Sequence, residues 1–266
     1  MDPSPPRRPH RGRHPFLDHD LPIAMAHRGG LDTGTENTMT AFEHAVGLGY
    51  RYVETDVHLT ADGVLVAFHD DRLDRVTDAT GAIADLTWDR VRRARVAGVD
   101  PIPRFEELLA AWPDLRINID PKDDRSVEPL AEALLAHDAL DRVCVGAFSD
   151  RRLGELRARC GPGLCTSMGP KAVARLIAAS RGIGRASFVE HAAQVPRSQS
   201  GIPIVTRRFV DAAHRAGLDV HVWTVNDANE MRELLELGVD GLITDRPGLL
   251  REVLIERDEW ESATTS

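Results

Sequence analysis

The chain has 266 residues, of which 42% are hydrophobic and 28% charged, a balance typical of a globular protein with one large or two small domains. Its formal net charge is -9 and its pI about 5.7. Because no basic field covers the body of the chain, the composition argues against a nucleic-acid binder, and we expect no nucleic-acid partner.

The three cysteines, Cys144, Cys160 and Cys165, match neither a zinc site nor a disulfide framework. We expect them to be reduced and mostly buried, which suits the cytoplasm. No apolar run approaches the roughly 20 residues that span a bilayer, and the basic N-terminus lacks the apolar stretch of a secretory signal, so we expect no stable membrane insertion. Proline and arginine content predicts a disordered tail over residues 1–21, and we expect a flexible tail over residues 259–266.

From residue 22 onward, short apolar or β-branched runs alternate with helical patterns, which favours parallel βαβ units. We expect the first strand over residues 23–27. A helix follows, with capping groups at 35–38 and an apolar stripe that reaches Leu48. The second strand is expected over 51–59 and another over 64–68, separated by a turn at 60–63. A parallel crossover needs about a dozen residues or more, so these two strands form an antiparallel hairpin.

The later elements repeat the same rhythm after an insertion over residues 71–99. Helices are expected over 88–94, 104–111, 127–137, 150–159, 170–179, 207–216, 228–237 and 247–257, and strands over 115–119, 142–147, 164–167, 186–189, 219–225 and 241–243. With the hairpin arm outside the wall, eight strands remain, so residues 22–258 are predicted to form an α/β fold, a (β/α)₈ TIM barrel. An open doubly wound sheet is the rival architecture, but no glycine-rich dinucleotide fingerprint follows the first strand.

Polar residues gather where these strands end, and in a barrel function lies at the carboxyl ends of the strands. His27 and Arg28 end the first strand, and Glu54 and Asp56, two residues apart on the second, point to one face. The segment Asp120-Pro121-Lys122 leaves the strand over 115–119 with the same spacing, and His69 ends the hairpin arm. A turn at 60–63 places Val57 opposite Val66 and Glu54 opposite His69, which brings His69 onto the carboxylates.

The carboxylates of Glu54, Asp56 and Asp120 predict a bound cation. Two like charges about 4 Å apart repel by about 4 kcal/mol at an effective dielectric near 20, so a carboxylate cluster needs compensation. Oxygen ligation favours Mg²⁺ or Ca²⁺. Arg28 and Lys122 add positive charge, and the two histidines can move protons, a combination that suits a phosphate. Each signal alone also fits a structural role, and only their convergence favours a metal-dependent phosphodiesterase.

At these residues the chain resembles the glycerophosphodiester phosphodiesterase family. The similarity extends from about residue 26 to 247 and rests on the segments AHRG (26–29), ENT (36–38), VETDV (53–57), HD (69–70), VWTVN (222–226) and GLITD (241–245). The resemblance implies hydrolysis of small-molecule glycerophosphodiesters to sn-glycerol 3-phosphate and an alcohol, with attack by water or first by a neighbouring substrate hydroxyl.

The resemblance also implies a role for each matching residue. His27 and His69 are the general acid–base pair, and Glu54, Asp56 and Asp120 hold the divalent metal. Arg28 and Lys122 bind the phosphate, and Trp223 lines the pocket for the alcohol. One departure is Asp120, since the family often has a glutamate there. The shorter aspartate leaves the metal open between Mg²⁺ and Ca²⁺.

Two further functions stay open at this point. One is a lipid-directed phosphodiesterase of the same fold, acting on lysophospholipids or sphingolipids; Asp-x-Lys also occurs in the related sphingomyelinases D. Exposed aromatic side chains at the barrel mouth would favour it, although aromatic residues make up only 5% of the chain. The other is a barrel that binds phosphorylated ligands without catalysis, against which the two histidines argue. The insertion over 71–99 is expected to shape the headgroup pocket, and the oligomeric state is not predicted.

Overall fold

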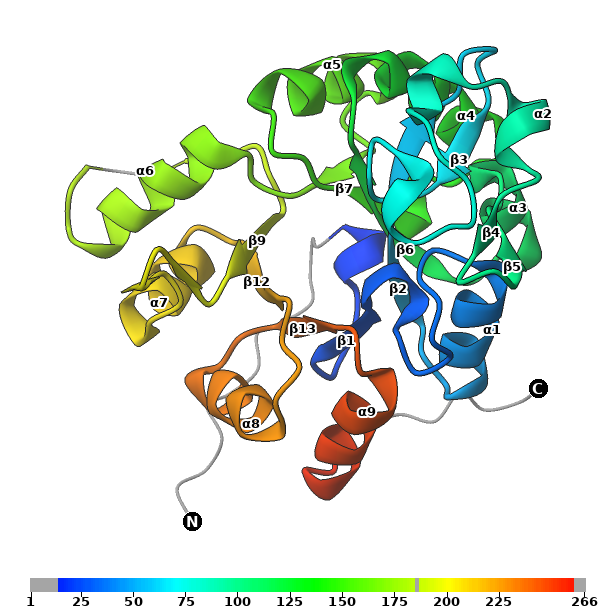
Figure 1. Cartoon of the computed structure of the whole chain (residues 1–266). Helices are drawn as coiled ribbons and strands as arrows, with labels where there is room; N and C mark the ends of the chain where they lie inside the picture. Colours follow the sequence, from blue (N-terminus) through cyan, green and yellow to red (C-terminus); the bar gives the residue numbers. More distant parts are fainter. Residues whose placement is uncertain (1–13, 185–186, 261–266) are drawn as a thin grey trace.

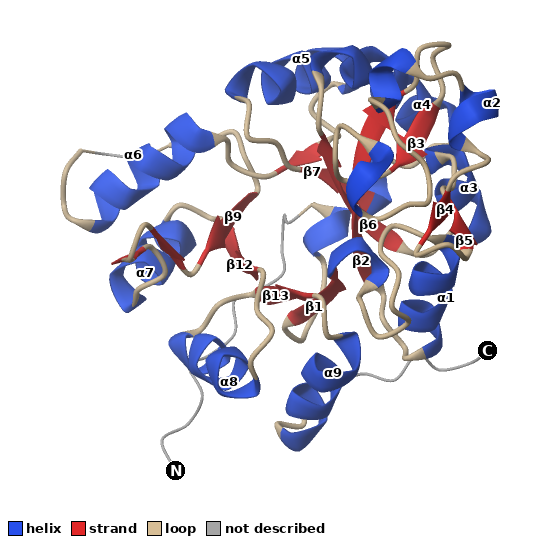
Figure 2. Cartoon of the chain, viewed as in Figure 1, coloured by secondary structure: helices blue, strands red, loops and turns tan. Residues whose placement is uncertain are grey.

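The computed structural model describes residues 14–184 and 187–260, and their strands form a barrel surrounded by helices (Figures 1 and 2). Within these residues, eight strands run in the order β8-β7-β6-β2-β1-β13-β12-β9, all parallel to their neighbours. The ring is completed between β8 and β9 by a parallel bridge of Ser167 and Ala192. The predicted (β/α)₈ barrel is therefore confirmed.

The barrel strands are β1 (Ile23–Ala26), β2 (Tyr52–Leu59), β6 (Arg116–Pro121), β7 (Val143–Val145), β8 (Cys165–Thr166), β9 (Ala192–Pro196), β12 (Asp219–Trp223) and β13 (Gly241–Thr244). The helices are α1 (Met39–Gly47), α2 (Trp88–Val91), α3 (Phe105–Ala111), α4 (Val127–Ala136), α5 (Asp150–Cys160), α6 (Pro170–Ser180), α7 (Arg207–Arg215), α8 (Ala228–Leu237) and α9 (Pro247–Glu256). Among the described residues, no helix has both the length and the apolar character needed to cross a membrane.

The strand predicted over residues 186–189 is wrong. The barrel strand is β9, which begins at Ala192, and Ala186 lies outside the described residues. Phe188 instead packs, partly buried, against the core and carries the guanidinium of Arg175 over its ring, 5.1 Å from the centroid. Only the segment from Ala192 onward pairs with β12, and its first residue, Ala192, is the register partner of Asp219. Tertiary pairing has therefore overridden local β-propensity.

The hairpin of β2 and β3 (Leu65–Ala67) is antiparallel as predicted, but its predicted register is wrong by one residue. Val57 pairs with Ala67 and His58 with Val66, not Val57 with Val66. The loop is one residue longer than predicted, because Val64 remains in it: the Thr60 N–H donates to the Val64 carbonyl (3.0 Å) and the Val64 N–H to the Thr60 hydroxyl (2.9 Å). Glu54 and His69 therefore are not cross-strand partners.

Two layers of apolar side chains hold the barrel. On β1, Ala24 and Ala26 face the helices, while Ile23 and Met25 belong to a smaller cluster inside the barrel. Phe16, on the 3₁₀ helix η1 (Pro15–Leu17), is fully buried in this inner cluster. All three cysteines are free and buried, as predicted.

Part of each segment predicted as a terminal tail belongs to the folded body. Residues 14–21 are part of the folded body, because Phe16 packs edge-on against Tyr52 and its carbonyl accepts the tyrosine O–H at 2.8 Å. At the other end, Trp260 packs against Tyr50 with ring centroids 5.1 Å apart. Residues 1–13 and 261–266 lie outside the described part of the chain.

The insertion after the hairpin has a core of its own. It contains α2, two further 3₁₀ turns, η3 (Leu73–Arg75) and η4 (Ile83–Asp85), and the small ladder of β4 (Arg95–Val96) with β5 (Asp100–Pro101). The helix predicted over 88–94 ends at Val91. Eight buried side chains form a separate apolar cluster that begins under β3 and continues through the insertion.

The remaining short elements lie between the barrel units. They are the β10 (Ser198–Gln199) and β11 (Ile202–Pro203) ladder and the 3₁₀ turns η2 (His27–Gly29), η5 (Asp124–Ser126) and η6 (Leu140–Arg142). Of these, η2 and the β10–β11 hairpin contribute side chains to the site described next.

Candidate active site

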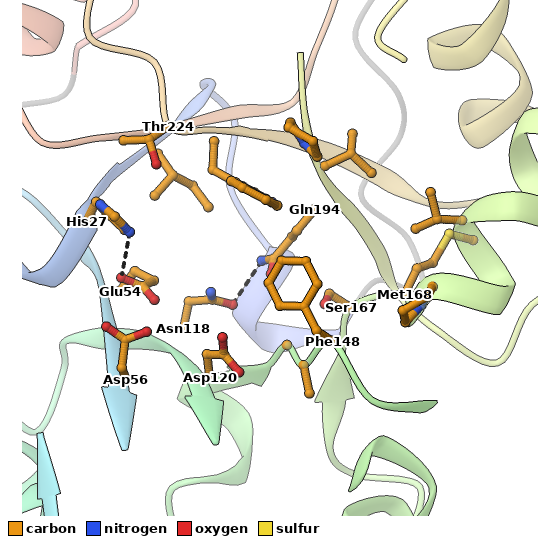
Figure 3. A pocket seen from close by; sticks show the side chains of 18 of the residues that line it. His27, Glu54, Asp56, Asn118, Asp120, Phe148, Ser167, Met168, Gln194 and Thr224 are labelled. Atoms are coloured by element: carbon orange, nitrogen blue, oxygen red, sulfur yellow. Dashed lines mark hydrogen bonds and ion pairs between the residues drawn. The ribbon is translucent and has the colours of Figure 1, made fainter. Parts of the chain in front are cut away.

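A cavity of about 440 Å³ opens at the carboxyl ends of the barrel strands, and all eight residues predicted to form the site line it. These residues are His27, Arg28, Glu54, Asp56, His69, Asp120, Lys122 and Trp223. Figure 3 shows His27, Glu54, Asp56 and Asp120 on one side of this cavity. The sequence-based convergence of these side chains is therefore found in the structure, although the hairpin register that suggested it for His69 differs.

A tight turn after β1 presents His27 and Arg28. Arg28 has φ 55°, Gly29 φ 82° and Gly30 φ 92°, so three successive residues adopt the left-handed region. A Cβ at Gly29 would lie 2.8 Å from backbone atoms of Ala41 and Phe42, which explains the need for glycine there. Arg28 is a strained non-glycine residue, held in place because its N–H donates to Glu54 Oε2 at 3.1 Å.

His27 lies between two carboxylates. Its Nδ1 is 2.6 Å from Asp245 Oδ1, and its Nε2 is 3.8 Å from Glu54 Oε2. Since an ionised carboxylate only accepts, Nδ1 carries the hydrogen and donates to Asp245. Burial lowers the pKa of His27, but the charge of Glu54 and the bond to Asp245 outweigh it, and the pKa lies above its ordinary value.

Asp245 is a site residue that sequence reasoning missed. It directly follows β13, whose last residue, Thr244, pairs with Ala26 immediately before His27. Asn226 fixes the carboxylate, since its side-chain amide donates to Asp245 Oδ2 at 2.8 Å and its carbonyl oxygen accepts the Asp245 N–H at 2.9 Å. The sequence signal was available, because the first and last strands of a closed barrel are neighbours.

The two carboxylates of β2 have different surroundings. Burial and the charge of Asp56 raise the pKa of Glu54 to about 7, although His27 and Arg28 act in the opposite direction. Burial would also raise the pKa of Asp56, but Lys122 and Arg28 outweigh it and the pKa lies below its ordinary value. Negative charge at Glu54 is therefore only partly compensated.

Lys122 joins the neighbouring strands β2 and β6. Its Nζ lies 2.7 Å from Asp56 Oδ1 and 2.7 Å from Asp120 Oδ2, and the two aspartates are register partners. Burial raises the pKa of Asp120 even with Lys122 beside it. Burial would lower the pKa of Lys122, but the two carboxylates hold it above its ordinary value.

His69 is held by its neighbour in sequence. Its Nδ1 lies 2.6 Å from Asp70 Oδ1, so both candidate histidines have an aspartate on Nδ1. Burial would raise the pKa of Asp70, but hydrogen bonds from Arg75 and His69 lower it to about 2. His69 lines the same cavity as the carboxylates of Glu54 and Asp56.

Arg75, from the insertion, is a second residue that sequence reasoning missed. Its guanidinium bonds Asp70 (Nε to Oδ2, 2.5 Å) and Glu36 (Nη2 to Oε1, 2.7 Å). Glu36 also accepts from Arg28 Nη1 at 3.0 Å. Arg75 therefore links Asp70, the partner of His69, with Glu36, the partner of Arg28.

Within the described residues, no three His, Cys, Asp or Glu side chains are grouped so that they could hold a metal ion as they stand. The donor chemistry nevertheless fits a hard cation. Glu54, Asp56 and Asp120 offer only oxygen ligands from adjacent strands, and a cation would offset both the burial and the charge of Asp56 that raise the pKa of Glu54.

The fold and the site together define a class: a (β/α)₈ enzyme with acidic, basic and imidazole side chains gathered at the carboxyl end of its barrel. Comparison with known proteins identifies the family. The profile of the glycerophosphoryl diester phosphodiesterase family matches residues 27–160 and 166–249. A Mycobacterium tuberculosis protein named "Probable glycerophosphodiester phosphodiesterase 2" is 40% identical over 255 residues, covering 93% of this chain and 96% of that protein.

Solved structures show the same fold. A glycerophosphodiester phosphodiesterase from Agrobacterium tumefaciens superposes with a TM-score of 0.71 at 24% identity, covering 87% of this chain and 100% of the other. An Oleispira antarctica phosphodiesterase, solved in complex with the product sn-glycerol-3-phosphate, superposes with a TM-score of 0.74 at 22% identity. The match covers 88% of this chain and 97% of the other. The chain belongs to the glycerophosphoryl diester phosphodiesterase family, and it is therefore a phosphoric diester hydrolase.

Proposed function

We propose that this chain hydrolyses glycerophosphodiesters to sn-glycerol 3-phosphate and an alcohol, with a divalent metal and with His27 and His69 as the acid–base pair. One observation carries the proposal beyond family membership. Two histidines line one cavity, and each has its Nδ1 within 2.6 Å of an aspartate. This arrangement fixes both rings and leaves each Nε2 available to the substrate.

The surroundings of His27 assign the two roles. The raised pKa of His27 keeps its imidazole protonated to higher pH, so His27 is the general acid and His69 the general base. A water oxygen forms the new bond to phosphorus while the ester bond to the alcohol breaks. His69 Nε2 takes the water proton, and His27 Nε2 gives a proton to the departing alcohol oxygen. In the alternative route a neighbouring glycerol hydroxyl loses its proton to His69, attacks phosphorus and displaces the alcohol, and water then opens the resulting cyclic phosphate.

The charged residues hold the phosphate. Arg28 and Lys122 bring positive charge to the cavity and bind the phosphoryl oxygens. A divalent cation held by Glu54, Asp56 and Asp120 supplies further neutralisation of the phosphate charge, and all-oxygen ligation favours Mg²⁺ or Ca²⁺. Trp223 lines the part of the cavity that receives the alcohol. The three free, buried cysteines support a reducing location, and we propose the cytoplasm.

The test is release of glycerol 3-phosphate from glycerophosphocholine, measured with Mg²⁺, with Ca²⁺ and after addition of EDTA. We expect turnover with at least one cation and its loss with EDTA. A barrel that only binds phosphorylated ligands would bind glycerol 3-phosphate without releasing it from any diester. Absence of metal-dependent release from every glycerophosphodiester tried would contradict the proposal.

A further inference from the structure

The cavity has a second end that catalysis does not use. Its charged lining residues all belong to the group around His27, Glu54 and Asp120, and the rest of the described lining contains no Asp, Glu, Lys or Arg. Figure 3 shows Met168 on the side opposite His27, with Phe148 and Gln194 between them. The side chains that form this apolar end are Phe148, Met168, Val173, Ile177, Ile204 and Trp223.

Helix α6 supplies one wall of the apolar end. Val173 and Ile177, one turn apart, both line the cavity, whereas Ala172 and Leu176 on the same helix are buried in the barrel core. The helix therefore has two apolar faces, and folding covers only one of them fully. Across the cavity, Ile204 follows the β10–β11 hairpin, whose residue Gln199 also lines the wall.

An aromatic pair, with one ring exposed and the other partly buried, lies at the mouth. Phe148 follows β7 and is 71% exposed, and its ring meets that of Trp223 edge-on with centroids 5.7 Å apart. This is the exposed aromatic side chain that favours a lipid-directed enzyme. Covering such a ring with hydrocarbon is favourable, since apolar area leaves water.

Between the two ends the cavity floor is polar but uncharged. The Gln194 side-chain amide donates to Asn118 Oδ1 at 2.9 Å, and Ser167 lies beside them on the lining. A substrate in this cavity would thus meet charge at its phosphate, neutral hydrogen-bonding groups next, and aliphatic and aromatic carbon at its far end.

We propose that the apolar end holds a hydrocarbon chain, so that the preferred substrates are glycerophosphodiesters carrying one alkyl or acyl chain. The inference rests on the proposed function, and the bonds that form and break in hydrolysis are the same. A cationic headgroup such as choline is the competing occupant, because aromatic rings attract quaternary ammonium groups. No Asp or Glu is among the described side chains that form the apolar end, however, and aliphatic side chains make up the rest of its wall, which favours a neutral chain.

The test is the rate of hydrolysis of glycerophospho-n-alkanols from ethyl to octyl. We expect kcat/KM to rise by up to about fourfold for each methylene that becomes buried, until the cavity is filled. Glycerophosphocholine is compared with its neutral isostere, the 3,3-dimethylbutyl ester, and the isostere should be the better substrate. A 1-acyl glycerophosphoethanol shows whether a chain on the glycerol side is also accepted. The inference would be overturned if the ethyl ester were cleaved but kcat/KM did not rise with alkyl length. It would also be overturned if glycerophosphocholine were a better substrate than its neutral isostere.

Matched variants test where the hydrocarbon chain of the substrate binds. Ile177→Ser should flatten the dependence on chain length and leave the rate of the ethyl ester unchanged, whereas Ile255→Ser, at a 46% exposed isoleucine on α9, should alter neither. Phe148→Ala serves the same purpose at a side chain too exposed for its loss to prevent folding. If both Ile177→Ser and Phe148→Ala kept the wild-type dependence on chain length, the hydrocarbon chain would bind outside the apolar end.

Failure of the proposed function would look different. If no diester is cleaved, binding still tests the inference, through calorimetric titration with octyl phosphate and with ethyl phosphate. Tighter binding of octyl phosphate, lost in Ile177→Ser, would support the apolar subsite in a non-catalytic barrel. Equal binding of the two phosphates would contradict it.

Discussion

The proton on His27 is governed by two carboxylates from distant parts of the chain, Glu54 on β2 and Asp245 after β13. Together they outweigh the effect of burial and raise the pKa of the imidazole. A general acid must be protonated at the working pH, so this pair of carboxylates extends the useful pH range upward. Asp245 contacts the ring and not the proposed reacting atom, and it is therefore a positioning residue.

We predict that Asp245→Asn lowers the pKa of His27, because the hydrogen bond and the negative charge on Nδ1 are weakened. The fall of kcat on the alkaline side of the pH profile should move to lower pH, and kcat should drop by roughly tenfold or more. The measurement is a pH–rate profile beside that of Asp258→Asn, a control remote from the cavity. If kcat of Asp245→Asn fell at the same alkaline pH as that of the wild type, Asp245 would not control the pKa of His27.

At the scale of elements, two segments fix the site: the turn after β1 and the insertion after the hairpin. The turn is possible because Gly29 approaches α1 closely. The insertion matters because Arg75 on η3 bonds both Asp70 and Glu36. The insertion thus supports His69 and Arg28 together, but none of residues 71–99 lines the cavity, contrary to the expectation that the insertion shapes the headgroup pocket.

We predict that Gly29→Ala destabilises the fold by about 2–4 kcal/mol, since the new Cβ is both in a left-handed backbone conformation and too close to α1. Gly63→Ala is the matched control, because Gly63 has φ 85° but no atom within 4 Å of the added Cβ. It should cost only the backbone strain, about 1 kcal/mol. Urea unfolding measures both. Equal losses in the two variants would show that the contact with α1 is unimportant.

We predict that Arg75→Met lowers kcat by about 10- to 100-fold, because both His69 and Arg28 lose support and small displacements of reacting groups are costly. Arg72→Met removes a neighbouring exposed arginine that pairs with Asp74, two residues away, and its kcat should match the wild type. Steady-state kinetics on glycerophosphocholine compares them. A change in KM alone would assign Arg75 to substrate binding instead.

Local sequence predicted most elements but not how they pair. The alternation of strands and helices was sufficient for the barrel, since eight βα units admit few other arrangements. The β9 segment was missed because Ala192 and Ala193 have weak strand propensity, and pairing with β12 decides their conformation. The hairpin register depended on one loop residue, Val64. Asp245 and Arg75 were missed because their roles arise from contacts across the fold.

At the scale of the whole molecule, stability and function occupy opposite ends of the barrel. Phe16 and Tyr52 close the amino end of the barrel, while the cavity lies at the carboxyl end. This separation is general in such barrels, where loops at one end can vary while the other end maintains the fold.

We therefore predict that Phe16→Ala destabilises the protein by about 3–5 kcal/mol, the usual cost of removing a fully buried ring. KM and kcat measured below the unfolding temperature should remain near those of the wild type. Leu135→Ala, at a half-exposed leucine of α4, is the control and should change stability little. A large change in KM in Phe16→Ala would show that the two ends are coupled.

The central claim is that two histidines on one cavity perform the acid–base chemistry of diester hydrolysis. The direct measurement is the initial rate of glycerol 3-phosphate release by the wild type, His27→Ala and His69→Ala, with saturating metal and verified folding. We predict that each substitution lowers turnover by at least about 100-fold. A p-nitrophenyl glycerophosphodiester, whose leaving group needs no proton, should restore much of the rate in His27→Ala but not in His69→Ala. Near wild-type turnover of glycerophosphocholine in either variant would contradict the mechanism.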